Sequence, residues 1–374
     1  MKTVLVTGSN GFVGKNLVVT LLQRTDIRVT GFDSDDDPAT LPALVREADF
    51  IFHLAGVNRP QNLEEFTSGN AGLTQTLISH LVGQGATTPL LISSSIQAAQ
   101  DNPYGVSKRQ AEEAVFAYGK QTGAPVYVYR LPNVFGKWCR PNYNSAVATF
   151  CNNIAHDLPI QINDPSVTMN LVYIDDVVTD FMAALDGEPR VADPYCQVHP
   201  VHAITLGGIV ELIHSFKESR ANLIVPDMSA PFTKKLYSTY LSYLPQDNFS
   251  YPLKMNVDQR GSFTEFIKTA DRGQVSVNIS KPGITKGNHW HHTKNEKFLV
   301  VSGQGLIRFR AVGGAEVIDY HVSGDKLEVV DIPTGYTHSI TNTGASDLVT
   351  VMWCNEMFDP EKPDTYFEAV DSKL

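Results

Sequence analysis

The sequence is poor in cysteine, in positive charge and in long apolar runs, and each shortage excludes a class of protein. Its four cysteines lie far apart with no C-x-x-C pair, which predicts free, buried thiols in a reducing cytosol. The formal net charge of -10 argues against general binding to nucleic acid or to a membrane surface, because both need a positive field. The first apolar run ends at Gly8, far short of a secretory signal or a membrane span. We therefore expect a cytoplasmic protein without membrane insertion.

The chain does contain enough apolar material for two cores. Hydrophobic residues make up 42% and charged residues 19% of its 374 residues, and this length favours two domains at roughly 150 residues each. In the first part, short apolar runs alternate with amphipathic stretches, which predicts parallel βαβ units with right-handed crossovers. Strands are expected at 3–7, 28–33, 49–56, 89–95 and 126–130, and helices at 12–23, 63–82 and 104–120.

The pattern changes after about residue 240. From Met255 onward the apolar runs are short, rich in Val, Ile and Phe, and separated by turn residues. Such spacing is typical of a small antiparallel barrel or sandwich. The tyrosine-rich stretch 235–251 is expected to join two domains, which we place at 1–243 and 252–374.

A glycine-rich loop follows the first expected strand. Gly8, Gly11 and Gly14 allow a tight turn and a close approach of the backbone to a pyrophosphate, and the next helix offers amides at its N-terminus. Asp33 ends the second strand about 20 residues later, where a carboxylate accepts from ribose hydroxyls and repels a 2′-phosphate. Taken alone, this residue favours NAD(H). The alternatives are an ordinary strand-to-helix turn, and an Asp33 that is out of register within a solvated acidic loop.

Tyr104 and Lys108 are four residues apart, so a helix places both on one face. An ammonium group near a phenol lowers the phenol's pKa and can hold a ribose, while the tyrosine exchanges a proton with a carbonyl or alcohol oxygen. A serine at the end of the preceding strand, 93–95, would hydrogen-bond the same oxygen. The alternative is a chance surface pair.

Together these residues resemble the extended short-chain dehydrogenase/reductase family, especially its nucleotide-sugar branch. The resemblance implies a Rossmann-type, doubly wound parallel sheet that binds NAD(P), with Ser95 (or Ser94) orienting the substrate carbonyl. It also places Asn133, Arg140 and Asn142 toward the diphosphate of a nucleotide sugar. The interval from Ser95 to Tyr104 is shorter than in most relatives. The matching motifs are Thr7-Gly8-Ser-Asn-Gly11-Phe-Val-Gly14, His53-Leu-Ala-Gly56, Ser93-Ser-Ser95, Tyr104-x-x-x-Lys108, Arg130-Leu-Pro-Asn133-Val-Phe-Gly136 and Tyr173-Ile-Asp175-Asp176-Val177.

A histidine cluster marks the second half. His289 and His291 are two apart on an expected strand and face one side, Glu296 begins the next strand, and His338 can reach them from an opposite hairpin. Three imidazoles and a carboxylate suit a divalent metal, with zinc the leading candidate among Zn, Fe, Ni, Mn and Cu. The alternative is four polar residues without a metal. His292 is expected to point outward.

These spacings resemble the two motifs of an all-β cupin barrel. The stretches 256–265 and 274–280 are similar to deoxysugar epimerases of the RmlC type. In those enzymes a histidine at the position of His289 removes a proton beside a ketone, and Lys286, Lys294 and Tyr336 are candidate helpers. One nitrogen of His289 cannot serve both as a metal ligand and as that base.

The order of the parts resembles the CapF type of bifunctional capsular polysaccharide synthesis enzyme over essentially the whole chain. The resemblance implies C3 epimerisation of a UDP-linked 4-keto-6-deoxy-N-acetylhexosamine and then reduction at C4 to UDP-2-acetamido-2,6-dideoxy-L-talose, on the way to UDP-N-acetyl-L-fucosamine. It implies NADPH, against the NADH that Asp33 favours, and a homodimer. Three alternatives remain open: a non-catalytic cupin for dimerisation or sugar binding, a cupin dioxygenase, and a regulatory NAD sensor.

Overall fold

The computed structural model describes residues 1–60 and 62–371. The chain divides into two compact units, the first formed by Met1–His214 with Pro231–Pro245 and the second by Ser215–Ala230 with the chain from Gln246 onward. All four cysteines are free, and three of them are buried while Cys139 is half-buried. Among the described helices, none combines the length and the apolar character that crossing a membrane requires.

The first unit is built on a seven-stranded sheet in the order β2-β1-β3-β4-β5-β9-β8. Its first five strands are parallel, as the alternation of strands and helices predicts, and β8 is antiparallel to β9. The order reverses between β1 and β3, which is where open α/β sheets bind their ligands. The strands are β1 (Lys2–Thr7), β2 (Ile27–Phe32), β3 (Phe50–His53), β4 (Leu90–Ser95), β5 (Val126–Leu131), β8 (Val191–Ala192) and β9 (Tyr195–Cys196).

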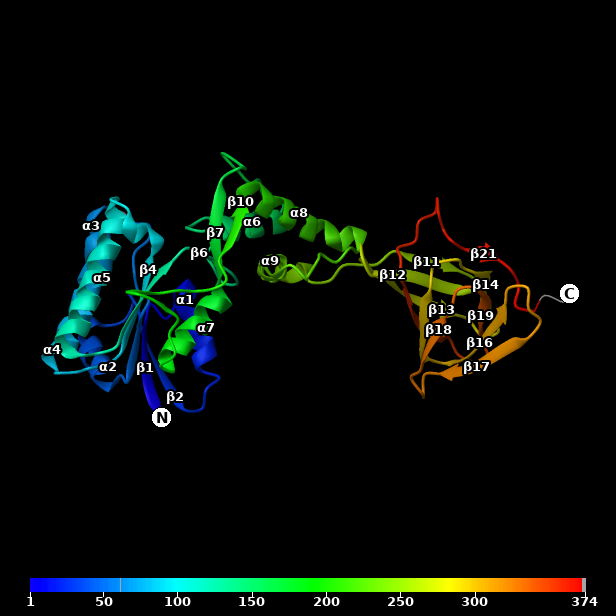
Figure 1. The fold of residues 1–374 in the computed structure, drawn as a ribbon, viewed down its shortest axis with the longest axis horizontal. Coiled ribbons are helices and arrows are strands. Elements are labelled where there is room, and N and C mark those ends of the chain that lie inside the picture. The colour runs from blue at the N-terminus through cyan, green and yellow to red at the C-terminus, as the bar shows by residue number, and fades with distance from the viewer. Residues whose placement is uncertain (61, 372–374) are drawn as a thin grey trace. The chain divides into compact units, whose positions relative to one another are not determined.

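Helices cover both faces of this sheet, so the predicted doubly wound arrangement is confirmed (Figure 1). Side chains alternate along β1: Val4 and Val6 join the core under α1 and α7, and Leu5 joins the core under α2, α4 and α5. The stretch expected as one helix at 63–82 contains a π-helical segment, η2 (Thr67–Gly72), and α2 was not expected. The helices are α1 (Phe12–Leu21), α2 (Leu41–Glu47), α3 (Glu64–Phe66), α4 (Leu73–Gly83), α5 (Pro103–Thr122) and α7 (Ile174–Leu185).

A smaller lobe completes the first unit. Its three-stranded sheet runs in the order β10-β7-β6, and α6 packs against α9 beside it. The hydroxyl of Tyr243 donates to the carbonyl of Cys139 at 2.5 Å and ties the end of this unit to the loop after β6. The elements are β6 (Asn133–Phe135), α6 (Ala146–Ala155), β7 (Thr168–Tyr173), β10 (His202–Thr205) and α9 (Pro231–Leu241). Helix α8 (Leu206–Asn222) begins in this unit, and its residues from Ser215 onward belong to the second.

The second unit is all-β apart from its first segment. A six-stranded sheet, β11-β12-β13-β20-β15-β18, and a five-stranded sheet, β17-β16-β19-β14-β21, enclose a core that includes Phe298, Ile307, Ile332 and Ile340. The described ladders between the strands of these two sheets are antiparallel. The strands are β11 (Met255–Asp258), β12 (Gly261–Thr269), β13 (Gly273–Ser280), β14 (Thr285–Trp290), β15 (Glu296–Ser302), β16 (Gln304–Ala311), β17 (Val317–Ser323), β18 (Val329–Ile332), β19 (Tyr336–Asn342), β20 (Leu348–Cys354) and β21 (Tyr366–Phe367).

The barrel expected from the sequence is not closed. Among the strands that the structure describes, no ladder joins the edge of one sheet to the edge of the other. Three of the four edge strands are short, with four residues in β11 and in β18 and two in β21, so few backbone groups are available there to continue the pairing. The unit is therefore two open sheets with a cavity between them.

Candidate functional sites

The glycine loop packs against the neighbouring strand end, which explains why its residues lack side chains. Gly8 has a φ of +72°, and a Cβ there would lie 2.7 Å from the backbone nitrogen of Ala55. A Cβ at Gly14 would lie 2.0 Å from the carbonyl oxygen of Gly8. Helix α1 begins after Gly11 with no side-chain cap, so its first amides remain available to an anionic ligand. This geometry fits the pyrophosphate of a dinucleotide.

Asp33 directly follows β2, in the register expected for a ribose acceptor. Its carboxylate accepts a hydrogen bond from the hydroxyl of Ser9 and another from the backbone N–H of Asn10 at 3.0 Å. These contacts hold the carboxylate beside the glycine loop. The acidic group therefore lies where the adenosine ribose of a dinucleotide is expected.

Tyr104 and Lys108 lie on the first two turns of α5 and line a cavity of about 680 Å³ together with Ser95. The Nζ of Lys108 lies 5.9 Å from the centroid of the Tyr104 ring and donates to the carbonyl of Ser93 at 3.2 Å. Burial raises the pKa of Tyr104, and its hydrogen bond with Ser95 opposes that rise. The pKa of the phenol is therefore raised, not lowered as expected from the sequence, and Tyr104 is held in its protonated form.

The two candidate serines have different surroundings. The hydroxyl of Ser94 donates to the carboxylate of Glu112 at 2.5 Å, and Glu112 also holds the guanidinium of Arg130 at 2.6 Å. Glu112 is only 2% exposed, so this pair belongs to the packed interior. Both serines line the cavity, but there Ser95 interacts with Tyr104. The geometry thus favours Ser95 for the role of orienting a carbonyl.

The substrate-binding candidates are brought together only in part. Asn133 and Arg140 line the cavity, and the guanidinium carbon of Arg140 lies 5.1 Å from the centroid of the Tyr143 ring. Asn142 is not among the lining residues; it adopts a φ of +53°, and its N–H donates to Thr149 at 3.0 Å. Sequence reasoning missed Trp138, which is 50% exposed and also lines the cavity.

The four metal-ligand candidates converge in the second unit. One ligand atom from each of His289, His291, Glu296 and His338 lies within 4.8 Å of all the others. His289 in β14 pairs directly with His338 in β19, whereas Glu296 begins β15 in the other sheet. Strand β14 ends one residue before His291, so a shared strand face does not by itself bring His291 to the site. The group therefore bridges the two sheets.

The donor atoms of this group fit a divalent cation. The Nε2 atoms of His291 and His338 lie 3.5 Å and 3.3 Å from one carboxylate oxygen of Glu296, and all three atoms are buried without a hydrogen-bond partner. Burial lowers the pKa of His289 to about 4, with a further contribution from His338, which keeps its imidazole neutral. Burial alone raises the pKa of Glu296, but His291 and His338 hold it well below its usual range. Neutral imidazoles and an ionised carboxylate are the forms that bind a cation.

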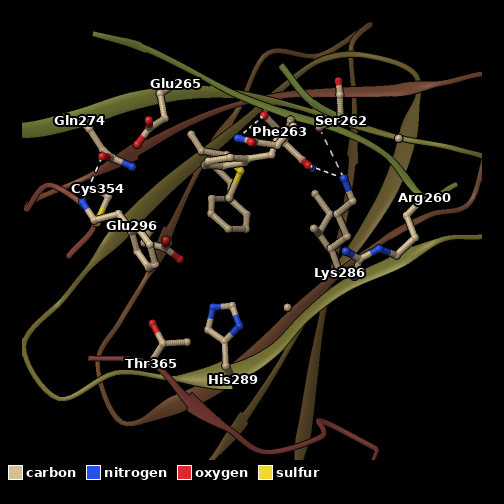
Figure 2. A pocket seen from close by; sticks show the side chains of 18 of the residues that line it. Arg260, Ser262, Phe263, Glu265, Gln274, Lys286, His289, Glu296, Cys354 and Thr365 are labelled. Atoms are coloured by element: carbon tan, nitrogen blue, oxygen red, sulfur yellow. Dashed lines mark hydrogen bonds between the residues drawn. The ribbon is translucent and has the colours of Figure 1, made fainter. Parts of the chain in front are cut away.

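A cavity of about 760 Å³ opens onto this group (Figure 2). His289 and Glu296 reach it from different strands, and Lys286 and Arg260 lie on another side. The Nζ of Lys286 donates to the side-chain oxygen of Asn278 at 2.7 Å and to the carbonyl of Ile279 at 2.9 Å. Burial lowers the pKa of Lys286. The cavity therefore combines a metal-ligand group with two basic side chains, of which Lys286 is held by these bonds and Arg260 pairs with Asp258.

The remaining candidates of the second unit have structural partners. Lys294 donates to the carbonyl of Pro363 at 2.8 Å and to the hydroxyl of Thr365 at 3.2 Å. Tyr336 packs against the hydrophobic core and is not among the residues that line the cavity. The ring centroid of His292 lies 4.6 Å from that of Trp290, and His292 is outside the ligand group, as expected.

Sequence reasoning missed Asp364. Its carbonyl and its carboxylate both bind the loop that carries His291, and no spacing rule signals this across 73 residues.

The first unit has a dinucleotide-binding sheet with a Ser–Tyr–Lys set at its ligand edge, and the second has an all-β cavity with a metal-ligand group. Such a combination defines a two-unit enzyme. Residues 4–193 match the NAD dependent epimerase/dehydratase family, and residues 256–366 match the polysaccharide biosynthesis C-terminal domain. The chain belongs to the NAD dependent epimerase/dehydratase family and, over its whole length, to the CapF type within it.

Relatives that match over nearly the full length of the chain support this family assignment. The chain is 51% identical over 363 residues, 97% of both chains, to UDP-2-acetamido-2,6-beta-L-arabino-hexul-4-ose reductase from Pseudomonas aeruginosa. It also matches the crystal structure of the capsular polysaccharide assembling protein CapF from Staphylococcus aureus, with a TM-score of 0.94, 56% identity, and coverage of 98% of this chain and 100% of that one. UDP-glucuronic acid 4-epimerase from Bacillus cereus, in complex with NAD, shares the fold of 57% of the chain at 20% identity and a TM-score of 0.52; 84% of that protein is covered.

Proposed function

We propose that the chain is a bifunctional nucleotide-sugar enzyme. The second cavity would invert C3 of a UDP-linked 4-keto-6-deoxy-N-acetylhexosamine, and the first would reduce C4 to give UDP-2-acetamido-2,6-dideoxy-L-talose for capsule or O-antigen, on the route to UDP-N-acetyl-L-fucosamine. One observation carries this proposal: a single chain holds a Ser95–Tyr104–Lys108 cavity and a separate cavity with a metal-ligand group. The name of the 51% identical relative supports the substrate, because it specifies reduction of a UDP-linked 4-ulose.

In the reduction, the residues of the first cavity bind and protonate the substrate. A nicotinamide dinucleotide held by the glycine loop supplies the hydride. Ser95 hydrogen-bonds the C4 carbonyl oxygen, and Tyr104 donates the proton that this oxygen needs as C4 is reduced. Lys108, buried beneath them, holds the nicotinamide ribose. The raised pKa of Tyr104 suits a proton donor.

In the epimerisation, the 4-ketone acidifies the hydrogen on C3. Loss of that proton to a base or water in the cavity, and addition of a solvent proton on the opposite face, would invert the centre. Lys286 and Arg260 would hold the anionic part of the substrate against the cavity wall. A divalent ion, with zinc the leading candidate, would be held by His289, His291, Glu296 and His338 and would stabilise negative charge on the substrate oxygen. We assign His289 to the ligand set, because its ligand atom lies within the same 4.8 Å group as the other three.

The proposal is tested by NMR of the UDP-4-keto-6-deoxy-N-acetylhexosamine incubated with the full chain in D₂O. Deuterium at C3 is expected without a dinucleotide, and a reduced C4 only with one. Reduction without any deuterium at C3 would instead leave the second unit as a non-catalytic binding module. Absence of both reactions would contradict the proposal as a whole.

Asp33 decides the preference for the dinucleotide. Its carboxylate lies where it would meet a 2′-phosphate, so it should disfavour NADPH relative to NADH, although the CapF resemblance implies NADPH. Asp33→Asn removes the negative charge, and we expect kcat/KM for NADPH relative to NADH to rise about 10-fold, the effect of about 1.4 kcal/mol. Steady-state kinetics with both dinucleotides measures the ratio. Asp35→Asn, on the exposed side of the same acidic run, is the control, and an unchanged ratio for Asp33→Asn would contradict the assignment.

The charge on the side chain of Lys108 should make the rate of reduction depend on pH. Burial lowers its pKa to about 8, although the charge of Glu112 partly opposes that shift. Below this pH the ammonium is present, and above it the charge is lost, so kcat/KM for reduction should fall as pH rises through about 8. A pH profile of C4 reduction measures this, with deuterium exchange at C3 followed in parallel as the internal control. A profile that stays flat through this range would exclude a role for the Lys108 charge.

A further inference from the structure

Asp364 joins the C-terminal segment of the second unit to a metal-ligand candidate. Its carbonyl oxygen lies 2.6 Å from the Nδ1 of His291. A carbonyl can only accept, so Nδ1 carries the proton and Nε2 keeps its lone pair. That Nε2 lies 3.5 Å from the carboxylate of Glu296. The contact therefore selects the tautomer of His291 that can ligate a cation.

The carboxylate of Asp364 organises the loop that follows His291. It accepts hydrogen bonds from three successive backbone N–H groups, those of His292 at 3.0 Å, Thr293 at 2.8 Å and Lys294 at 2.8 Å. This loop connects β14 in one sheet with Glu296 at the start of β15 in the other. One residue thus fixes both the ring of His291 and the path of the chain between two ligand candidates.

The C-terminal segment is itself attached around the site. The N–H of Glu368 donates to the carbonyl of Asn288 at 2.9 Å, and the N–H of Val370 donates to the side-chain oxygen of Asn288 at 3.1 Å. Asn288 lies between the paired residues Gly287 and His289 at the irregularity in β14. Docking of the segment and placement of His289 and His291 therefore share the same contacts.

We propose that Asp364 is a positioning residue for the metal site, and that through it the docking of the C-terminal segment and the binding of the metal stabilise each other. The inference rests on the metal site of the proposed function. It goes beyond that function because it assigns a role to a segment outside the four ligands. Since coupling between two binding events is reciprocal, metal should order the segment as much as the segment favours the metal.

The test is the affinity of the full-length chain for Zn²⁺, measured by competition with a chromogenic chelator. Asp364→Asn keeps the backbone carbonyl and the size of the side chain, and asparagine tolerates the φ of +39° at this position. It replaces one acceptor oxygen by an amide nitrogen that cannot accept, so the affinity should fall about 10- to 100-fold. Asp359→Asn in the same segment, whose carboxylate accepts from the N–H of Glu361, should bind Zn²⁺ like the wild type.

A second measurement separates positioning from general destabilisation. In hydrogen exchange, Zn²⁺ should slow exchange of the amides of 292–294 and of Glu368 in the wild type, and the effect should shrink in Asp364→Asn. A purely structural residue would change these amides equally with and without metal, which would overturn the inference. Unchanged affinity in Asp364→Asn, with tight binding by the wild type, would overturn the inference alone. Absence of saturable Zn²⁺ binding by the wild type would overturn the metal site and the inference with it.

Discussion

Tyr104→Phe is expected to lower the rate of C4 reduction by about 100- to 10,000-fold, the usual contribution of a positioned proton donor. The substitution removes one oxygen and keeps the aromatic ring, whose centroid lies 5.5 Å from that of the Phe66 ring. The lost hydroxyl is the group whose pKa burial raises and which interacts with Ser95. Reduction at C4 then lacks its proton donor, while deuterium exchange at C3 should proceed at the wild-type rate. Both rates are measured by NMR in the same D₂O incubation.

Tyr118→Phe is the matched control for this experiment. Tyr118 lies on the same helix and is 1% exposed, and its hydroxyl donates to the carbonyl of Thr88 at 2.9 Å, away from the cavity. Its loss should cost about 1 kcal/mol in the free energy of unfolding and leave reduction unchanged. If Tyr104→Phe reduced the sugar normally, the proposed role of Tyr104 as the proton donor would be contradicted.

His338→Ala is expected to abolish deuterium exchange at C3. It should also weaken Zn²⁺ binding by more than about 10- to 100-fold, the usual cost of losing a residue that only hydrogen-bonds a metal ligand. His338 is 1% exposed and contributes one of the four converging ligand atoms. Without it, the carboxylate of Glu296 loses its partner at 3.3 Å and stays buried. Metal content per chain and NMR in D₂O measure the two effects. Reduction of a supplied ketone in the first unit should continue.

The same experiment on His289 separates the two roles considered for it. As a ligand, His289→Ala loses both the metal and the exchange at C3. As the base alone, it would lose the exchange and keep the metal. His292→Ala is the control, because this neighbouring histidine packs on Trp290 and Tyr366 outside the ligand group. Retention of metal by His289→Ala would contradict our assignment of His289 as a ligand.

Local chemistry explains why much of both sites could be predicted from sequence. A strand followed by Gly8, Gly11 and Gly14 has few conformations other than a tight turn into a helix. Residues four apart, such as Tyr104 and Lys108, share a helix face wherever that helix lies. The burial of β1 on both faces follows from its continuous apolar run. These features depend on neighbours within one or two elements.

Other features depend on segments that only the folded chain brings together. Ser95 could be separated from Ser94 only because Glu112, 18 residues beyond Ser94, accepts the hydroxyl of the latter. Asn142 was expected at the substrate, but its turn conformation places it outside the residues that line the cavity. The closed barrel was expected from strand spacing, yet spacing does not determine whether the two sheet edges pair.

The sequence by itself determined which chemical groups the chain carries: a glycine-rich loop after a strand, a tyrosine four residues before a lysine, and three histidines with a glutamate. The tertiary structure decided how those groups are held. Asp364 shows the reason, because its contact with His291 spans 73 residues and joins a C-terminal segment to the edge of another strand. Helix and strand periodicities report only local geometry, whereas such a contact depends on the packing of two sheets and on the path of the chain across them.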